Sequence, residues 1–212
     1  MINFKNQNGR SMIEMLGVLA IIGVLSVGGI AGYSKAMMKY RINKTIEQIT
    51  LIAGNIRTFF ASQGNYGVLR SDTDTGKAII KKAKLVPDEM WSTDERGDFR
   101  LESAFGTMFL LAAPLYDDFR DIDARKSFII DSNDLPTEAC IEIATMDWSS
   151  TGNRILSVVI NPTTIDELDG GFIDNCTTSG QLTCNENLPV SIDKAVQLCD
   201  SGDENNVQIK FY

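Results

Sequence analysis

The feature that most constrains this chain is a run of nineteen residues without a charged side chain, from Met15 to Tyr33. An apolar helix of this length is about long enough to cross the hydrocarbon core of a bilayer. A protein that remains wholly in the cytosol is therefore not expected. The segment before the run, Met1–Gly9, is polar, and Lys5 is its one charged residue.

Beyond the apolar run the sequence keeps the period of a helix. Apolar residues recur at spacings of three and four and form an amphipathic stripe, made of Ile42, Ile46, Ile49, Ile52, Ile56, Phe59 and Phe60. Four polar residues are expected largely off that stripe: Lys39, Lys44, Gln48 and Arg57. A continuous helix from about Ser11 to Ala61 would be roughly 75 Å long. Its second half can pack on a globular body, whereas its first half must be buried by lipid or by copies of itself.

From Gly64 onwards the pattern becomes that of an α+β domain. A short helix is expected at Lys77–Leu85, behind the turn-rich segment Ser71–Gly76. Five strands are expected from the apolar, β-branched runs, at Asp98–Glu102, Thr107–Ala112, Ser127–Asp131, Arg154–Ile160 and Val207–Phe211.

Two further helices are expected in the second half of this domain. Asp134 can cap a helix that runs through Cys140 to Met146, since Pro136 is tolerated in a first turn. Ser191 can cap a helix that runs to Cys199.

The charge of the chain is distributed unevenly. The formal net charge is −8, yet the segment 35–57 has five basic residues and one acidic residue, whereas 58–212 has 13 basic and 26 acidic residues. Nucleic-acid binding by such an acidic body is disfavoured, because it requires clustered Lys and Arg. The basic segment is either a solvated helix face or a surface for anionic headgroups or an acidic neighbouring subunit.

The composition argues against catalysis. The chain has no histidine, which excludes Ser-His-Asp and Cys-His catalysis and His-containing metal sites. The sequence contains no G-x-x-x-x-G-K-[ST] and no G-x-G-x-x-G motif. Acidic turns at Ser71–Gly76 and Asp166–Gly170 loosely resemble calcium loops without completing the twelve-residue pattern. The acidic cluster Asp117–Asp123 is either a surface turn or a contact with a neighbour. We expect no enzyme activity, no cofactor and no metal.

All four cysteines lie in the last third of the chain: Cys140, Cys176, Cys184 and Cys199. An even number behind a membrane segment indicates two disulfides formed in an oxidising compartment, the alternative being four buried thiols. Three pairings are possible. Cys176–Cys184 is the local one and leaves Cys140–Cys199 to close a long loop.

Glu14 lies within hydrophobic sequence, where an ionised carboxylate costs about 2.5–3.5 kcal/mol. A secretory signal would be cut after its apolar run, but the cleavage-like glycine, Gly9, precedes this run. A cut after Gly9 would create an amine on Arg10, four residues from Glu14 and so its nearest plausible counter-charge. The alternative is a carboxylate that reaches the headgroups.

These residues resemble the N-terminus of the type IV pilins. That family has a short basic leader ending in glycine, a prepilin-peptidase cut, glutamate at the fifth mature position and about twenty apolar residues. Gly9, Arg10, Glu14 and the run Met15–Ile30 match that register. The chain departs from the family at Arg10, where a large apolar residue is usual, and at Ala31, where a helix-kinking proline is common, so any bend would come from nearby glycines.

The remainder of the chain resembles the type IVb pilins, the toxin-coregulated pilus group. The shared features are Gly64-Asn65-Tyr66 after the long helix, a cysteine on a mid-domain helix and Leu198-Cys199 before the last strand. The nine-residue leader is shorter than is usual in that group.

The resemblance implies a pilin fold, with a long N-terminal helix packed on an antiparallel sheet. The expected organisation is a leader at 1–9, a membrane-spanning and filament-core helix at 10–33, its amphipathic half at 34–62 and a disulfide-bonded α+β head at 63–212. Its function would be that of a pilus subunit. Its partners would be copies of itself, prepilin peptidase, the pilus assembly machinery and, before assembly, the membrane.

The expected location is the bacterial inner membrane with a periplasmic head, followed by the extracellular pilus. The positive-inside rule taken alone favours a cytoplasmic head, because Lys35, Lys39, Arg41 and Lys44 follow the apolar run. The cysteines and the leader register favour the periplasm. A minor pilin, a type II secretion pseudopilin and a membrane-anchored periplasmic enzyme are the alternative functions.

Overall fold

The computed structural model describes residues 12–95, 97–113, 127–151, 154–162, 182–184, 187–200, 202 and 204–212. By its internal contacts the chain divides into two compact units, Met1–Tyr40 and Arg41–Tyr212. One helix, α1 (Met12–Phe60), contributes to both. The expected continuous helix is thus confirmed, and it runs unbroken through Gly28, Gly29 and Gly32.

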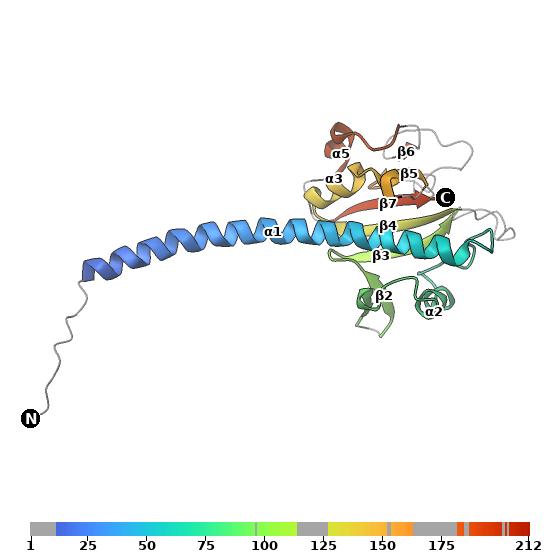
Figure 1. The fold of residues 1–212 in the computed structure, drawn as a ribbon, viewed down its shortest axis with the longest axis horizontal. Helices are drawn as coiled ribbons and strands as arrows, with labels where there is room; N and C mark the ends of the chain where they lie inside the picture. The colour runs from blue at the N-terminus through green and yellow to red at the C-terminus, as the bar shows by residue number, and fades with distance from the viewer. Residues whose placement is uncertain are drawn as a thin grey trace, which may run out of the picture. The chain divides into compact units, whose positions relative to one another are not determined.

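The second unit contains a seven-stranded antiparallel sheet among the described residues, in the order β1-β2-β3-β4-β7-β5-β6 (Figure 1). The strands are β1 (Trp91–Thr93), β2 (Phe99–Glu102), β3 (Thr107–Ala113), β4 (Ser127–Leu135), β5 (Ile155–Ile160), β6 (Leu182–Cys184) and β7 (Asn205–Phe211). The C-terminal strand β7 therefore lies between β4 and β5, in the interior of the sheet.

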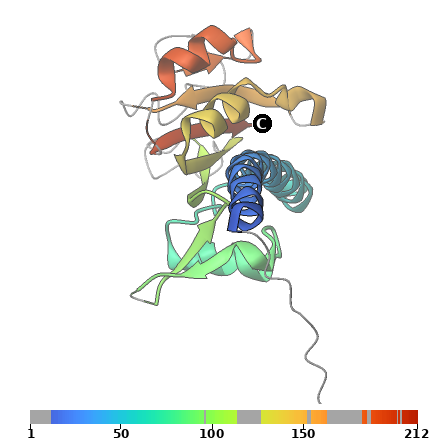
Figure 2. The same ribbon diagram turned by 90° about the vertical axis from the view of Figure 1, so that its left-hand side faces the viewer.

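Three shorter α-helices and two single 3₁₀ turns complete the described part of this unit. They are α2 (Asp74–Lys82), η1 (Asp88–Met90), α3 (Thr137–Thr145), η3 (Trp148–Thr151) and α5 (Ile192–Leu198). Viewed along α1, helix α2 with β1 and β2 lies on one side of the second half of α1, and α3 with α5 lies on the other (Figure 2).

The amphipathic half of α1 packs into the core of the head. The side chains of Ile42, Ile49, Ile52 and Ile56 are fully buried. At the end of the helix the Phe60 ring lies 5.5 Å from Tyr66, and a chain of ring contacts continues into the sheet through Phe128 and Phe211. The predicted stripe therefore faces the sheet, although Phe59 remains 42% exposed.

Gln48 was expected off the stripe, and this expectation is wrong. Its side chain is buried because position 48 lies one turn from Thr45 and Ile52, on the packed face. The Gln48 Oε1 atom has no hydrogen-bond partner among the described residues.

Helix α2 begins three residues before the predicted start at Lys77. Thr73 caps it by accepting a hydrogen bond from the Gly76 N–H at 3.2 Å. Only a residue without a side chain fits at position 76, because a Cβ there would lie 1.7 Å from the Arg70 carbonyl oxygen. The Thr73 cap and this close approach of the Arg70 backbone explain why a glycine occupies the first turn of the helix.

The predicted cap of the mid-domain helix is also wrong. Asp134 remains in β4 with a positive φ of 58°, and its carboxylate accepts the Thr107 N–H at 3.3 Å. Helix α3 instead begins at Thr137, with Pro136 at the N-cap and no side-chain cap. Ser191 caps α5 as predicted, by accepting the Lys194 N–H.

All five predicted strands are present, within four residues at either end. The two strands that the sequence did not predict, β1 and β6, have three residues each. Three residues are too few to show an alternating pattern.

One buried carboxylate in the middle of the sheet forms no ion pair with a cation among the described residues. Asp131 on β4 is 7% exposed and opposes Gln208 on β7, whose Nε2 donates to Oδ2 at 3.3 Å. Its Oδ1 has no partner among the described residues. Burial raises the pKa of Asp131 to about 6, although hydrogen bonds from Gln208, Asn206 and Asn133 act in the opposite direction.

We predict that Asp131→Asn stabilises the head at neutral pH. Because the pKa of Asp131 is about 6 in the folded protein and about 4 in the unfolded chain, the folded state binds one more proton between these values. Asp131 therefore lowers the free energy of unfolding as the pH rises from 4 to 6, by up to about 3 kcal/mol. Plotted against pH, the free energies of unfolding of the two proteins, measured by denaturant unfolding, should coincide near pH 4, separate between pH 4 and pH 6, and remain a constant distance apart at higher pH.

Asp72 provides a control of opposite sign. Its hydrogen bond with Arg70 lowers the pKa of this carboxyl, so its stabilising contribution is present above pH 4 and lost in acid. Asp72→Asn should therefore destabilise the protein at neutral pH. A difference between wild type and Asp131→Asn that does not vary with pH would contradict the assignment.

Candidate assembly interface

The first half of α1 exposes an apolar surface on every side. Each described residue from Met12 to Met37 is exposed. Twelve of the large apolar side chains are more than 40% exposed: Met12, Ile13, Met15, Leu16, Val18, Leu19, Ile21, Ile22, Val24, Leu25, Val27 and Ile30. By length and composition α1 is the one helix among the described residues that could cross a membrane.

The free energy at stake in this surface is large. Burying one such side chain contributes about 1.5–3 kcal/mol, so twelve contribute about 18–36 kcal/mol. That sum exceeds the whole stability of a typical domain, about 5–15 kcal/mol. The segment therefore requires a hydrophobic surrounding of some kind.

Glu14 lies in the first turn of α1, at the start of the apolar surface. Acidic side chains are favourable at this end of a helix because the unpaired backbone N–H groups carry partial positive charge. Glu14 is exposed. The predicted processing residues, Gly9 and Arg10, lie outside the described residues, so the structure brings no counter-charge into view.

One of the two predicted disulfides, Cys140–Cys199, is present in the structure. Cys140 on α3 and Cys199 at the end of α5 form a disulfide with a Cα–Cα distance of 6.0 Å, across 59 positions of sequence. Cys184 on β6 is disulfide-bonded as well. Cys176 lies outside the described residues, so its pairing with Cys184 stays a prediction.

Asn205 supports the Cys140–Cys199 bridge and was not anticipated from the sequence. This residue is 1% exposed, and its amide nitrogen donates to the Leu135 carbonyl at 3.0 Å. Its amide oxygen accepts from the Asp200 N–H at 2.7 Å and from Asn161 at 2.9 Å. Asn205, the first residue of β7, thereby binds Leu135 just before α3 and Asp200 just after α5. No local sequence signal distinguishes Asn205 from other asparagines.

Arg41 fixes α1 to the turn between β2 and β3. Its Nε donates to the Ala104 carbonyl at 2.9 Å, and its guanidinium lies 4.5 Å from the centroid of the Phe105 ring. The sequence showed Arg41 only as one member of a basic segment.

The one acidic segment within the described residues, Ser71–Gly76, does not have the arrangement of a calcium loop. In Ser71–Gly76, Asp72 pairs with Arg70 and Asp74 opens α2. Among the described residues, no three acidic or cysteine side chains lie close enough together to hold a metal ion. The other two acidic segments, 117–123 and 166–170, lie outside that part.

The arrangement of a long N-terminal helix on an antiparallel sheet is that of the type IVb pilins. A crystal structure of a type IVb pilin from Salmonella typhi matches with a TM-score of 0.53 and 15% identity, covering 79% of this chain and 97% of that one. TcpA, a type IV pilin from Vibrio cholerae El Tor biotype, matches with a TM-score of 0.50 and 14% identity, covering 81% and 98%. At this identity the likeness shows the fold.

The family follows from the sequence of the head. The model of the family described as PilS N terminal matches residues 39–211, so this chain belongs to that family. A comparison with curated proteins finds no match. Family and fold together define a pilin subunit, and the predicted resemblance to the type IVb group is confirmed.

We predict that replacing Cys140 and Cys199 together by serine lowers the free energy of unfolding by about 4 kcal/mol, because the bridge closes a loop of about 60 residues. Denaturant unfolding of the double variant and of wild type measures this difference. Reduced wild type should lose at least as much.

Cys199→Ser alone is the matched control. It should cost as much as the double variant, since either change removes the same bridge. Single and double variants with the stability of wild type would refute a structural role. Peptide mapping that joins Cys140 to Cys176 would refute the pairing itself.

Proposed function

We propose that this pilin is made as a precursor, cut after Gly9, and polymerised into a type IV pilus filament. The observation that carries the proposal is the exposed apolar surface of α1, with twelve large side chains more than 40% exposed. A bilayer covers such a helix before assembly, and neighbouring copies of the same helix cover it afterwards. A head-to-tail contact that does not close on itself produces a fibre.

Glu14 has a role in assembly under this proposal. In an apolar filament core an unpaired carboxylate is expensive, so a cation must compensate it. The candidate is the new N-terminal amine of Arg10 on an adjacent subunit, where attraction would guide the register of each added copy. The Arg10 guanidinium offers a second cation at the same place.

The location and the partners follow from this function. The precursor would span the inner membrane once with its head in the periplasm, where the Cys140–Cys199 bridge can form. It would then meet prepilin peptidase and the pilus assembly machinery, and finally copies of itself. The acidic head, with 13 basic against 26 acidic residues in 58–212, does not favour nucleic acid.

The role is structural rather than catalytic in this proposal. Support comes from the family and from the two pilin structures that share the fold. A minor pilin or a pseudopilin would share the same helix and processing, and its abundance in sheared filaments would distinguish it from a major subunit.

We predict that the mature subunit begins at Arg10. Gly9 precedes the apolar run, so the cut would fall on the cytoplasmic side of the membrane and leave 203 of the 212 residues. Intact-mass measurement of purified subunits tests this. Retention of Met1 in filaments would refute processing.

We predict that Glu14→Gln inserts and is cleaved normally but polymerises poorly. The substitution keeps the shape of the side chain and removes its charge. Removing one partner of a buried charge pair costs about 2–5 kcal/mol, so the filament yield should fall by about tenfold or more. Sheared filaments quantified against total cell-associated subunit provide the measurement.

Glu47→Gln is the matched control, because Glu47 is an exposed glutamate on the same helix but in its amphipathic half. Its yield should equal that of wild type. Wild-type yield from Glu14→Gln would show that the charge is dispensable, and uncleaved Glu14→Gln would move its role from assembly to processing.

A further inference from the structure

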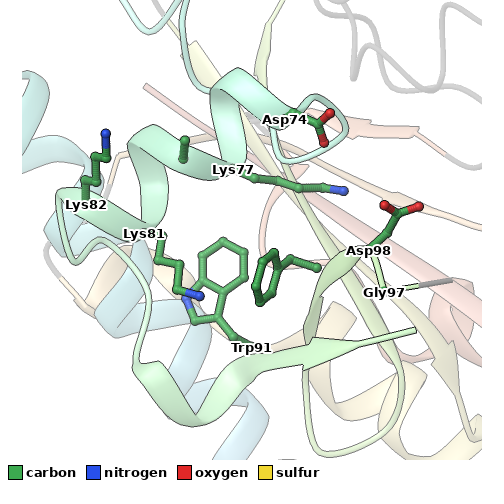
Figure 3. Close-up of a pocket in the computed structure, with 9 residues that line it drawn as sticks. Asp74, Lys77, Lys81, Lys82, Trp91, Gly97 and Asp98 are labelled. Atoms are coloured by element: carbon green, nitrogen blue, oxygen red, sulfur yellow. The ribbon is translucent and has the colours of Figure 1, made fainter. Parts of the chain in front are cut away.

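A cavity of about 370 Å³ opens between α2, β1 and β2 of the head (Figure 3). Its base is aromatic. The rings of Trp91 on β1 and Phe99 on β2 meet edge to face, with centroids 6.5 Å apart and an interplanar angle of 88°. Phe99 is 47% exposed. The volume lies at the lower end of the range for small-molecule sites, about 300–1,000 Å³.

Three lysines from α2 line the same cavity: Lys77, Lys81 and Lys82. The Lys81 ammonium lies 3.9 Å from the centroid of Phe99 and 5.6 Å from that of Trp91. The ion pairs found among the described residues involve none of the three, whereas the adjacent Lys84 pairs with Asp88 at 2.8 Å. These cations are concentrated on a body that is otherwise acidic.

The cavity also contains hydrogen-bond acceptors. The carboxylates of Asp74 and Asp98 line it beside the lysines, as the close-up shows. At its base the Trp91 Nε1 is buried without a hydrogen-bond partner among the described residues. A ligand for this site therefore needs an apolar face, a negative charge and hydroxyl groups together.

We propose that this cavity binds an acidic sugar, a carboxylated pyranose unit of a polysaccharide. The C–H face of a pyranose packs on an aromatic surface such as Phe99. The sugar carboxylate would take up the ammonium of Lys81, whose attraction to exposed rings is weak, together with Lys77 or Lys82. Asp98 and Asp74 would accept hydrogen bonds from the hydroxyl groups.

The two carboxylates decide between ligand classes. A fatty acid or another apolar anion would gain from the lysines and the rings, but Asp74 and Asp98 would repel it and receive no donor in return. A neutral sugar would use the rings and the carboxylates but leave the lysines without an anion. The site lies within one unit of the chain, because α2, β1 and β2 all belong to Arg41–Tyr212.

The test is a titration of the full-length protein in a polyoxyethylene detergent, which contains no sugar. The probes are trigalacturonate and, as the neutral counterpart, maltotriose. Tryptophan emission is a local readout, since Trp91 lines the cavity and the other tryptophan, Trp148, is 1% exposed. We expect saturable, salt-sensitive binding of trigalacturonate, and binding of maltotriose at least about tenfold weaker, since a hydrogen bond to a charged group contributes about that factor.

Lys81→Gln and Phe99→Ala should each weaken trigalacturonate binding by about tenfold or more. Lys84→Gln is the matched control, because Lys84 lies just beyond α2, outside the cavity and paired with Asp88; it should bind like wild type. Circular dichroism verifies folding, and the surface change Lys81→Gln keeps the test valid if Phe99→Ala misfolds.

Several results would overturn the proposal. They are an absence of trigalacturonate binding to wild type, equal binding of maltotriose, and equal losses in Lys81→Gln and Lys84→Gln. Lysine-dependent binding of phosphatidylglycerol vesicles or of a polyglutamate peptide without binding of trigalacturonate would assign the cavity to a lipid or to an acidic protein segment instead.

Discussion

The constraint on which the structure depends is the unfavourable exposure of the apolar side chains of α1 to water. The backbone N–H and C=O groups of α1 hydrogen-bond to one another as in any helix. From Met12 to Met37, however, the described side chains are exposed and mostly apolar. From Ile42 to Phe60 the same helix buries its apolar stripe against the sheet of its own chain. One element therefore combines a segment that the head covers with a segment that needs lipid or further copies. The function proposed for the chain is the simplest answer to that requirement.

The C-terminal part of the head is held in place by the sheet, a disulfide and a buried asparagine. Strand β7 lies between β4 and β5, so the C-terminus is held inside the sheet. The Cys140–Cys199 bridge joins α3 to α5, and Asn205 links the residues flanking both helices to the start of β7. Covalent and polar contacts thus support the part of the head farthest from α1 in sequence. The buried carboxylate of Asp131 works against stability at neutral pH in the same sheet.

Much of this architecture could be predicted from the sequence, because the helical period of α1 and the apolar, β-branched runs of the strands are local signals. The helix Met12–Phe60 and the five longer strands belong to this class. The errors arose where tertiary contacts override local signals. Asp134 has the chemistry of a cap but accepts a hydrogen bond from Thr107, 27 positions away in sequence. Gln48 is polar yet buried by its position on the helix. Asn205 and the cavity at Trp91 depend on residues brought together only by folding.

Under the proposed function, copies of this chain bury one another's apolar helices in a filament. Electron microscopy of sheared surface filaments, with mass spectrometry of their subunits, can detect such an assembly. We expect fibres that contain this chain, with its head accessible at the surface. Detection of the chain only in the membrane fraction, and its absence from every sheared fibre, would rule this function out.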